Sequence, residues 1–417
     1  MDKNVLTADP SLMRDFNKAL VLTLIRQQGT ISRADIAKQT HLSRSTVSNI
    51  VTELLAAKLV QESGAGQSQG GRRPILIEFN YQAGYVVGIE LGATHIFVVV
   101  TDLKPQAIAE MERDFDLTTG PEAGLSLVAE MTRQVLVQAE VSLEQVVGIG
   151  WGVPGPVRHT TGTVAFPPIM PGWHGFPLRA RLEEELGVTV YLDNDANLGA
   201  LGEWAHGAGQ GVDNLAYIKV GTGIGCGLIL GGEIYRGQSG SAGEIGHITV
   251  DENGPPCRCG NYGCLESMAA GPVIAHRAQS AIRAGEKTVL STAKPLEEIT
   301  AADVSRAASQ GDPLSLQLFH EAGRHIGVAL AGLINLFNPK LIIIGGGMAQ
   351  AGDILLEPIR RSVQSHGLRI AVESCQIVQA QLGREATALG AVTLVLEKMF
   401  HGPELSLAVS TPLPTCP

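Results

Sequence analysis

Aromatic side chains make up only 4 % of the 417 residues and charged side chains only 17 %, whereas the chain holds 50 glycines. The low share of charge argues against an intrinsically disordered chain. Together with 44 % hydrophobic residues, this composition favours an α/β protein with filled cores and many tight loops. The length exceeds that of one ordinary domain and predicts two or three.

Long hydrophobic runs and dense cysteine are also missing. The N-terminus has no apolar signal-peptide core, and the apolar stretch 326–347 is interrupted by Asn335 and Lys340. That stretch predicts a buried helix followed by a buried strand, so we expect a cytoplasmic protein with no membrane partner. Six cysteines are too few for a disulfide scaffold, but three of them lie within eight residues, which indicates a metal site.

In contrast to the rest of the chain, the N-terminal part holds fewer acidic than basic residues. Residues 1–74 hold ten Lys and Arg against six Asp and Glu, while the remainder holds 21 against 35. A basic head on an acidic body predicts that the head contacts a polyanion.

The basic head has the pattern of a helix-turn-helix. A first helix over 12–28 is expected to bury one face, made of Leu12, Phe16, Leu20 and Leu24. Ser32 and Ser43 are the expected N-caps of two shorter helices. The outer face of the third helix carries side chains suited to base edges and phosphates. We expect DNA contacts from Arg44, Ser45, Ser48 and Asn49.

A wing follows the third helix. Strands are expected over 59–62 and 75–79, and the glycine-rich tip between them ends in Arg72 and Arg73. Two arginines on a glycine hinge suit a narrow minor groove. The alternative is an interdomain linker with two solvated arginines. We assign residues 1–80 to a winged helix-turn-helix DNA-binding domain.

The body contains two similar pieces, residues 86–103 and 216–234, each a strand, a glycine-rich turn and an antiparallel strand. Such turns expose backbone N–H groups that can hold an anion, although any single turn can equally bind nothing. Two copies predict a duplicated lobe with a cleft between the copies. A third glycine-rich turn, 345–347, follows another apolar strand.

Between the two pieces, a strand leads into Asp193, Asn194 and Asp195 at the start of a helix. A carboxylate beside an amide can grip vicinal hydroxyls, and the carboxylate can also serve as a general base. Helix capping is the alternative role, and we expect one of the three residues to do only that.

The most specific pattern is His-x9-Cys-x-Cys-x4-Cys, formed by His247, Cys257, Cys259 and Cys264. It predicts a tetrahedral, structural zinc site. Four protein ligands leave no open position for water, which argues against hydrolysis. Glu244 and Glu266 flank the ligands, so the metal would hold polar residues toward one ligand.

The body resembles the ROK family of repressors and sugar kinases. The motifs that carry the resemblance are GVPGPV (152–157), PGWHGFPL (171–178), DNDANLGALGE (193–203), VGTGIGCG (220–227), AGEIGH (242–247) and CRCGNYGCLE (257–266). The segment around PGWHGFPL is most similar to the xylose-repressor-like branch. The resemblance implies an α/β, two-lobed actin/hexokinase-like (duplicated RNase H-like) fold, with lobes over 81–195 plus 384–402 and over 196–383.

The resemblance also implies roles for matched residues. The sugar-binding set would be Asn194, Asp195, Glu244, His247 and Glu266. Asp195 would be catalytic only if kinase activity is retained. His247 would use one ring nitrogen for zinc and the other for a sugar hydroxyl.

The phosphate side of the cleft departs from the kinase pattern. Kinase members have Asp-x-Gly-Gly-Thr where this chain has Glu90 to Thr94, and Ala93 adds a Cβ where a phosphate would approach. His95 and Ile169 also replace common kinase residues. This argues against ATP as a cofactor and favours a sensor over an enzyme. The vestigial phosphate loops would be formed by Gly92, Thr94, Gly221, Thr222 and Gly223.

We therefore expect a sugar-responsive transcriptional regulator, a repressor of carbohydrate-metabolism genes. It would act as a homodimer or higher homo-oligomer on a pseudo-palindromic double-stranded DNA operator. Its effector would be a neutral monosaccharide such as xylose or glucose, because the matched positions hold carboxylates and no Lys or Arg. The alternatives are an ATP-dependent sugar kinase with a fused DNA-binding domain and a scaffold that binds a partner protein.

Overall fold

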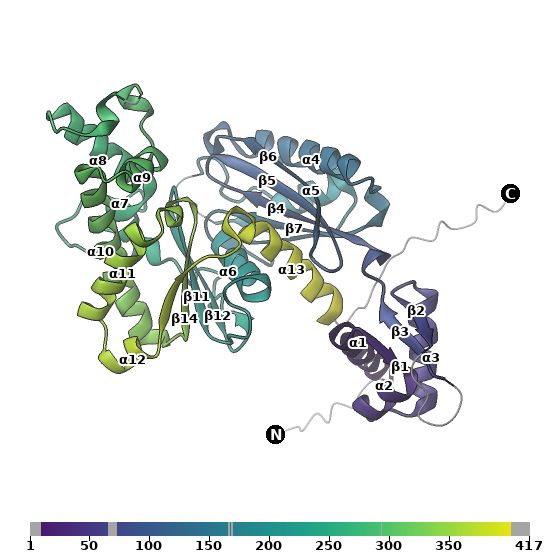
Figure 1. Cartoon of the computed structure of the whole chain (residues 1–417). Helices are drawn as coiled ribbons and strands as arrows, with labels where there is room; N and C mark the ends of the chain where they lie inside the picture. The colour runs from purple at the N-terminus through teal and green to yellow at the C-terminus, as the bar shows by residue number, and fades with distance from the viewer. Residues whose placement is uncertain (1–9, 66–72, 166, 168–169, 293, 402–417) are drawn as a thin grey trace, which may run out of the picture.

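The computed structural model describes residues 10–65, 73–165, 167, 170–292 and 294–401. A small N-terminal head stands beside a larger body of two lobes (Figure 1). None of the described helices is both long and apolar enough to cross a lipid bilayer. The domain bounds given above remain predictions, and the two lobes are described here by their sheets.

The head is a winged helix-turn-helix, as expected. Its helices are α1 (Pro10–Gln28), α2 (Arg33–Thr40) and α3 (Arg44–Ala56). Its antiparallel sheet has the order β1 (Thr30–Ser32), β3 (Ile75–Phe79), β2 (Val60–Ala65). The predicted N-caps are present, because the Ser32 and Ser43 hydroxyls accept hydrogen bonds from the backbone N–H groups of Asp35 and Thr46. The caps fix where α2 and α3 begin, and with them the outer face of α3.

The buried face of α1 differs from the predicted one. Phe16 is 65 % exposed and Leu20 is 38 % exposed, whereas Val21, Leu22 and Ile25 are buried. Among the side chains of α1 that the structure describes, from residue 13 onward, those in the C-terminal half contribute to the core shared with α2 and α3. Burial therefore follows the neighbouring helices rather than the four-residue spacing of apolar residues.

The first lobe is built on a five-stranded sheet with the order β10-β7-β4-β5-β6. Its strands are β4 (Tyr85–Leu91), β5 (His95–Asp102), β6 (Ala107–Asp114), β7 (Val146–Val153) and β10 (Val190–Asn194). Helices α4 (Pro121–Gln138) and α5 (Leu178–Leu186) cover one face. Trp151 and Trp173 are fully buried in this lobe, and the Trp173 indole N–H donates to the Leu117 carbonyl at 3.0 Å.

The second lobe repeats this topology with the order β13-β12-β11-β14-β15. Its strands are β11 (Leu215–Val220), β12 (Ile224–Leu230), β13 (Glu233–Ile234), β14 (Leu341–Gly345) and β15 (Gln376–Gln379). In each lobe three antiparallel strands are followed by two parallel ones. The duplication predicted from the two glycine-rich pieces is thus confirmed by strand order.

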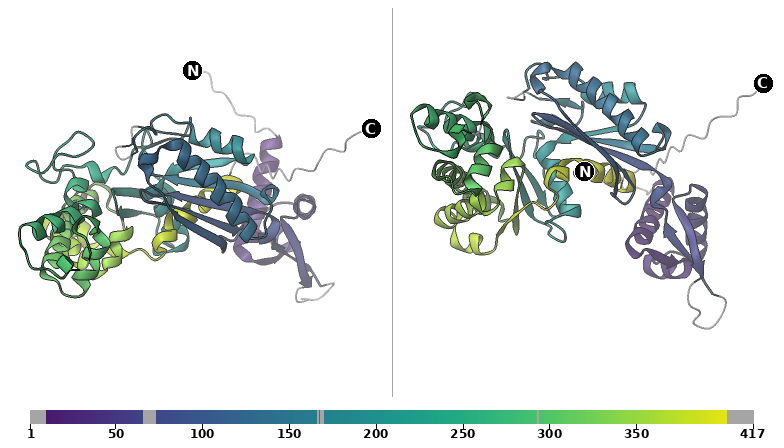
Figure 2. Two further views of the ribbon diagram at one scale, coloured as in Figure 1. Left: turned by 90° about the horizontal axis from the view of Figure 1, so that it is seen from above. Right: turned by 45° about the horizontal axis from the view of Figure 1, so that its top comes forward.

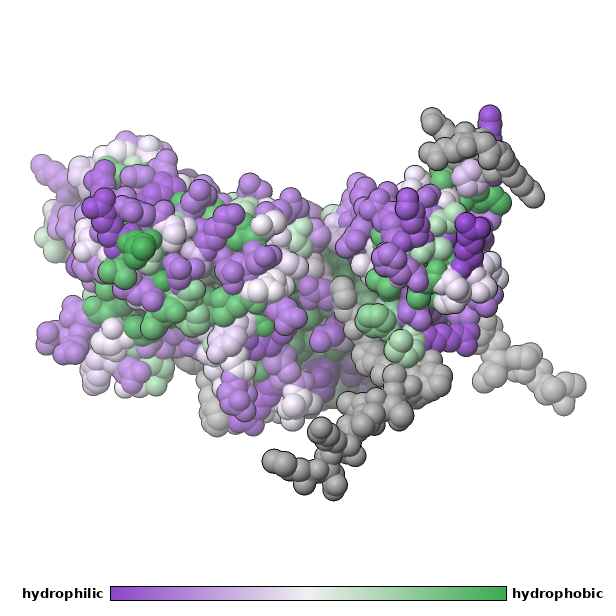
Figure 3. Space-filling model, turned by 90° about the horizontal axis from the view of Figure 1, so that it is seen from below, coloured by the Kyte–Doolittle hydropathy of each residue, from purple (hydrophilic) through white to green (hydrophobic). Residues whose placement is uncertain are grey.

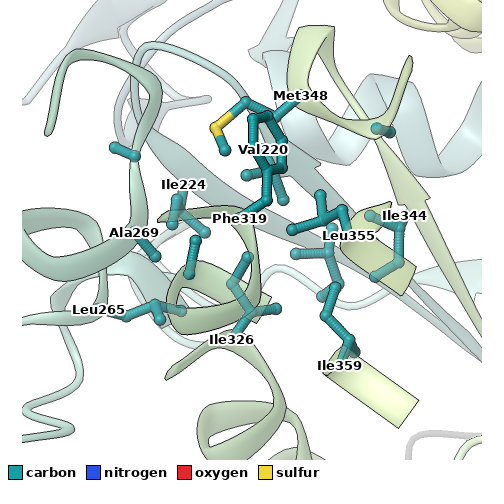
Figure 4. Packing of buried hydrophobic residues seen from close by; sticks show 14 of the residues in the cluster. Val220, Ile224, Leu265, Ala269, Phe319, Ile326, Ile344, Met348, Leu355 and Ile359 are labelled. Atoms are coloured by element: carbon teal, nitrogen blue, oxygen red, sulfur yellow. The ribbon is translucent and has the colours of Figure 1, made fainter. Parts of the chain in front are cut away.

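Helices cover the outer face of the second sheet. They are α7 (Leu265–Ala269), α8 (Gly271–Arg283), α9 (Ala301–Ser309), α10 (Pro313–Phe337), α11 (Asp353–His366) and α12 (Arg369–Glu373). Phe319 and Ile326 of α10 pack against Ile344 of β14 and Ile359 of α11 (Figure 4). Seen from below, apolar residues also gather on the surface of this lobe (Figure 3).

Two helices each follow the last strand of one lobe and pack on the sheet of the other lobe. Helix α6 (Asp195–His206) follows the last strand of the first lobe but packs on β11 and β12 of the second. Helix α13 (Ala386–His401) follows the last strand of the second lobe but packs on β4 and β7 of the first. The two helices also cross each other, so each lobe is completed by a helix that leaves the other.

The crossing of α6 and α13 requires glycine on both helices. A Cβ at Gly202 would lie 2.1 Å from the Ala386 carbonyl oxygen, and one at Gly390 would lie 1.7 Å from the Leu198 carbonyl oxygen. Both distances are far below van der Waals contact with backbone atoms, which cannot move aside as a flexible side chain can. The helices therefore approach backbone to backbone.

The far end of α13 joins the body to the head. The Phe400 ring lies 5.7 Å from the Phe79 ring of β3, and the Arg26 guanidinium of α1 lies 3.8 Å from the centre of the Phe400 ring. Residues of the head, of α13 and of the first sheet form one continuous apolar core. Figure 2 shows the head beside this end of the first lobe.

Gly390→Ala tests the crossing. The added methyl group would overlap the backbone of α6, so we expect a loss of about 1–3 kcal/mol in the free energy of unfolding. The matched control is Gly332→Ala, because Gly332 is an exposed helical glycine with open space around its Cβ position. The control should gain up to about 1 kcal/mol from helix propensity. Equal thermal melting of the two variants would contradict close packing at the crossing.

Candidate functional site

A cavity of about 640 Å³ lies between the two lobes. This volume is in the range of small-molecule sites. Every residue predicted for sugar binding or for a phosphate loop lines this one cavity: Gly92, Thr94, Asn194, Asp195, Gly221, Thr222, Gly223, Glu244, His247 and Glu266. The structure thus brings together residues that are up to 174 positions apart in the chain, while their chemical roles remain predictions.

The three polar residues at the junction of β10 and α6 have different partners. Asn194 is the N-cap of α6, since its Oδ1 accepts from the N–H groups of Ala196 and Asn197. Its Nδ2 donates to the Gly155 carbonyl and keeps one N–H for a ligand. Asp193 is fully buried outside the cavity lining, where its Oδ2 accepts two hydrogen bonds from Arg236. This pair joins β10 to the loop that follows β13.

Asp195 is paired with a lysine that the sequence analysis did not anticipate. The Lys219 ammonium at the end of β11 donates to Asp195 Oδ2 at 2.8 Å and to Glu90 Oε1 at 2.5 Å. Burial lowers the pKa of Lys219, but the Asp195 and Glu90 carboxylates outweigh burial and raise it above the ordinary value. The expectation that no cation offsets the carboxylates is therefore wrong, because Lys219 lies outside the motifs that were compared.

Glu244 and Glu266 complete the carboxylate set. Glu266 Oε2 accepts from the Ile224 N–H at 3.1 Å, which ties it to the second glycine-rich turn. Burial, with smaller contributions from Asp195 and Glu266, raises the pKa of Glu244 to about 7. The cavity therefore offers acceptors at Asp195 and Glu266, and a carboxyl group at Glu244 that can donate when it is protonated. Mixed donors and acceptors suit sugar hydroxyls, which do both.

The first glycine-rich turn is covered by its own histidine. A Cβ placed on Gly92 would lie 2.5 Å from the His95 ring, so the imidazole lies directly against the backbone of the turn. Ala93 packs in part on the core of the first lobe. The side chain that packs against the Gly92 backbone is thus the His95 ring, whereas the expectation from the sequence rested on the Ala93 methyl group.

The predicted metal ligands lie together. The ligand atoms of His247, Cys257, Cys259 and Cys264 are all within 4.8 Å of one another. The Cys259 and Cys264 sulfurs are 3.7 Å apart, close to the spacing of about 3.8 Å that two 2.3 Å Zn–S bonds give in a tetrahedron. His247 turns Nδ1 toward Cys257, at 3.7 Å. Its Nε2 is thereby left for the cavity that this histidine lines.

In the head, the predicted DNA contacts share one surface. Arg44, Ser45, Ser48 and Asn49 are all exposed on α3, while Val47, Ile50, Val51 and Leu54 face the core. Arg73 is exposed two residues before the start of β3. Arg72 lies outside the described residues.

Sequence reasoning also missed the apolar part of the cavity. The second lobe contributes Pro272, Ala275, Ile299, Ala302 and Met348 to its lining. Isolated apolar residues in helices and loops carry no signal that separates lining from core. For Lys219 there was a signal, because a lysine inside an otherwise apolar strand that ends at a glycine-rich turn is unusual.

Comparison with known proteins follows the division into head and body. The model of the ROK family matches residues 86–398, and the model of the MarR family matches residues 15–70. The putative xylose repressor of Caldicellulosiruptor sp. strain Rt8B.4 is 35 % identical to this chain, over 94 % of this chain and 98 % of that protein.

Two solved structures of ROK family proteins, one a regulator and one a kinase, are similar to this chain. A ROK family transcriptional regulator, described as a homolog of the E. coli MLC protein, has a TM-score of 0.81 and 30 % identity, covering 94 % of this chain and 98 % of that chain. A ROK family glucokinase from Streptomyces griseus in complex with glucose and AMPPNP has a TM-score of 0.66 and 32 % identity. It covers 75 % of this chain and 99 % of that chain.

The kinase thus accounts for three quarters of the chain, whereas the regulators also account for the head. The head carries the exposed polar face of α3 that an enzyme does not need. The chain belongs to the ROK family, as one of its winged helix-turn-helix transcriptional regulators.

Proposed function

We propose that this protein changes its affinity for an operator when a neutral monosaccharide binds in the cavity between the lobes, and that it acts as a repressor. The observation that carries the proposal is the cavity itself, which gathers the complete predicted sugar-binding set in a chain that also presents an exposed polar face on α3. A repressor fits the relative named as a putative xylose repressor.

Helix α13 supplies a physical route between the two sites. At its start, the Thr387 hydroxyl donates to the Asp195 carbonyl at 3.3 Å, and at its end Phe400 contacts the head. A sugar that binds one arrangement of the lobes more tightly shifts the population toward it. Because α13 packs on α6 backbone to backbone, a change in lobe angle moves the helix as a body and so moves the surface beneath the head.

The direct test is operator binding in the presence of sugars. An operator is selected from a random duplex library with the full-length protein, and its affinity is then measured with a panel of monosaccharides. We expect one sugar to change the affinity by about tenfold or more. If no sugar changes it, the cavity does not regulate the head.

An ATP-dependent sugar kinase is the competing function. The cavity favours a regulator over this alternative for two reasons. The Lys219 ammonium donates to Asp195, the predicted base, and the His95 ring packs against the first glycine-rich turn. ATP consumption with the same sugar panel separates the two functions. Turnover coupled to one sugar would establish the kinase.

The charge of the cavity favours a sugar without phosphate. Asp195 and Glu266 line the cavity and Glu90 contacts Lys219, so three carboxylates stand against the ammonium of Lys219, and Glu244 adds charge as the pH rises above about 7. A phosphate a few ångströms from this group would meet like charge in a partly closed space. Xylose and glucose are the candidates, the first from the name of the relative above.

The effector prediction uses Asp195. In calorimetric titrations we expect a free monosaccharide to bind more tightly than its phosphate ester. Asp195→Asn should keep affinity within about tenfold, because an amide still bonds a hydroxyl, whereas Asp195→Ala should lose about 1.5–3 kcal/mol. Asp353→Asn is the control, since Asp353 is 80 % exposed on α11. Tighter binding of a sugar phosphate would show that the charge argument fails.

We also propose one structural zinc ion per chain, held by His247, Cys257, Cys259 and Cys264. The four ligand atoms cluster with spacings that suit a tetrahedral ion. Zinc would fix the loop from which α7 begins, and Glu266 stands in the first turn of α7. It would also fix the ring of His247 at the edge of the cavity. Neither effect gives the metal a catalytic part.

The zinc prediction compares two cysteines. Purified protein should hold about one zinc per chain. Cys259→Ser should lose the metal and weaken sugar binding about tenfold or more, because Glu266 and His247 lose their fixed positions. Cys375→Ser should keep both, since Cys375 lies outside the cluster. Elemental analysis and sugar titration measure the two effects, and metal-free wild-type protein with full sugar affinity would contradict the site.

For DNA, we propose that a homodimer places two α3 helices on the half-sites of a pseudo-palindrome. A single head offers one short recognition helix, and twofold symmetry doubles the contacts. The polar, exposed residues of α3 would read the major groove, with Arg73 and its neighbour Arg72 in the adjacent minor groove.

The DNA prediction tests the two arginines of the wing. Arg72→Ala with Arg73→Ala should weaken operator binding and lower the slope of log affinity against log salt by about 1–2. Arg44→Ala should also weaken binding. Arg369→Ala is the control, because Arg369 is 90 % exposed on α12 of the second lobe. Unchanged affinity in the double variant would show that this segment is only a linker.

A further inference from the structure

Glu90 and Lys219 occupy equivalent positions in the two halves of the duplication. Each lies two residues before the first glycine of its turn. Glu90 of β4 precedes Gly92, and Lys219 of β11 precedes Gly221. Both strands are the middle strands of their five-stranded sheets. The two lobes therefore carry opposite charges at matching positions, and of the two side chains Lys219 lines the cavity.

These two charges meet, with Asp195 as a third partner. Lys219 Nζ is 2.5 Å from Glu90 Oε1 and 2.8 Å from Asp195 Oδ2. The Glu90 side chain is 5 % exposed and that of Lys219 is 20 % exposed. Two of the three N–H donors of the ammonium are thus committed to carboxylates.

Each carboxylate oxygen of Asp195 already accepts a hydrogen bond from a protein donor, which leaves capacity to accept from a ligand but ties Oδ2 to a cation. Its Oδ1 accepts from the Ala196 N–H at 2.9 Å, and its Oδ2 accepts from Lys219. A carboxylate that takes a proton from a sugar hydroxyl needs an oxygen that can turn to that hydroxyl. Here the ammonium holds that oxygen.

A cleft that transfers a phosphoryl group also needs a divalent cation beside the phosphate turns. Such a cation bridges the phosphate oxygens and is itself held by carboxylates. Glu90 stands two residues before the first glycine of the first turn, Asp195 is the predicted base, and the Lys219 ammonium lies between the two carboxylates, in contact with both. An ammonium satisfies the same carboxylates with no metal.

We propose that Lys219 is a built-in cation that stands in place of a divalent metal between Glu90 and Asp195. It excludes the metal and occupies the oxygen that a kinase would use as base, so the cavity binds a ligand without metal or nucleotide. Lys219 would thus determine which ligands the cavity accepts, and this role does not involve the head. The proposal therefore holds or fails independently of whether a sugar alters DNA binding.

The test is binding of Mn²⁺ to full-length, zinc-loaded protein, followed by the electron paramagnetic resonance signal of free Mn²⁺. Zinc loading keeps the cysteine cluster filled. Lys219→Met removes the ammonium and leaves two carboxylates facing each other, so we expect about one Mn²⁺ per chain, bound at least about tenfold more tightly than by wild type. Adding Glu90→Gln to this variant should return binding to the wild-type level.

Lys219→Arg is the matched control, because it keeps a cation and should stay at the wild-type level. If Lys219→Met does not give a cooperative thermal melt, Lys219→Gln replaces it, since its amide can still bond a carboxylate without charge. A folded neutral variant that binds Mn²⁺ no better than wild type overturns the proposal. So does a gain of binding that survives Glu90→Gln, because the metal would then lie elsewhere.

Discussion

The contact between the backbones of α6 and α13 is the constraint on which the rest of the structure depends. Each helix leaves one lobe and completes the other, and the two meet where Gly202 and Gly390 leave no room for a side chain. The start of α6 carries Asp195 into the cavity, while the end of α13 carries Phe400 to the head. One helix crossing therefore sets the positions of the ligand site, the lobes and the DNA-binding domain.

Around this crossing, charge is arranged so that the lobes meet through ion pairs rather than apolar contacts alone. Lys219 joins β11 to Glu90 of β4, and Arg236 joins the second lobe to Asp193 of β10. Buried ion pairs are poor sources of net stability, because desolvation offsets much of the attraction. They favour one defined geometry, however, because separating the two partners would leave a buried charge unpaired. That property suits two lobes that must occupy defined arrangements.

Much of this could be predicted from sequence, and the failures have identifiable causes. The caps at Ser32 and Ser43, the duplicated strand order and the clustering of His247 with three cysteines all rest on local patterns with fixed spacing. The buried face of α1 and the partner of Asp195 depend on which elements pack together. Lys219 is 24 positions from Asp195 and 129 from Glu90, and no spacing rule links residues across two lobes.

The distribution of tryptophan gives the two parts of the protein different optical signatures. Trp151 and Trp173 are buried in the first lobe, Trp204 lies in α6, and residues 1–150 contain none. Intrinsic fluorescence therefore reports the environment of the first lobe and of the helix that carries Asp195, and a head that unfolds while the body stays intact leaves it nearly unchanged. Because the head contributes three helices, its unfolding would instead appear in the far-ultraviolet circular dichroism. Recording both signals during one denaturation separates loss of the DNA-binding domain from loss of the ligand-binding body.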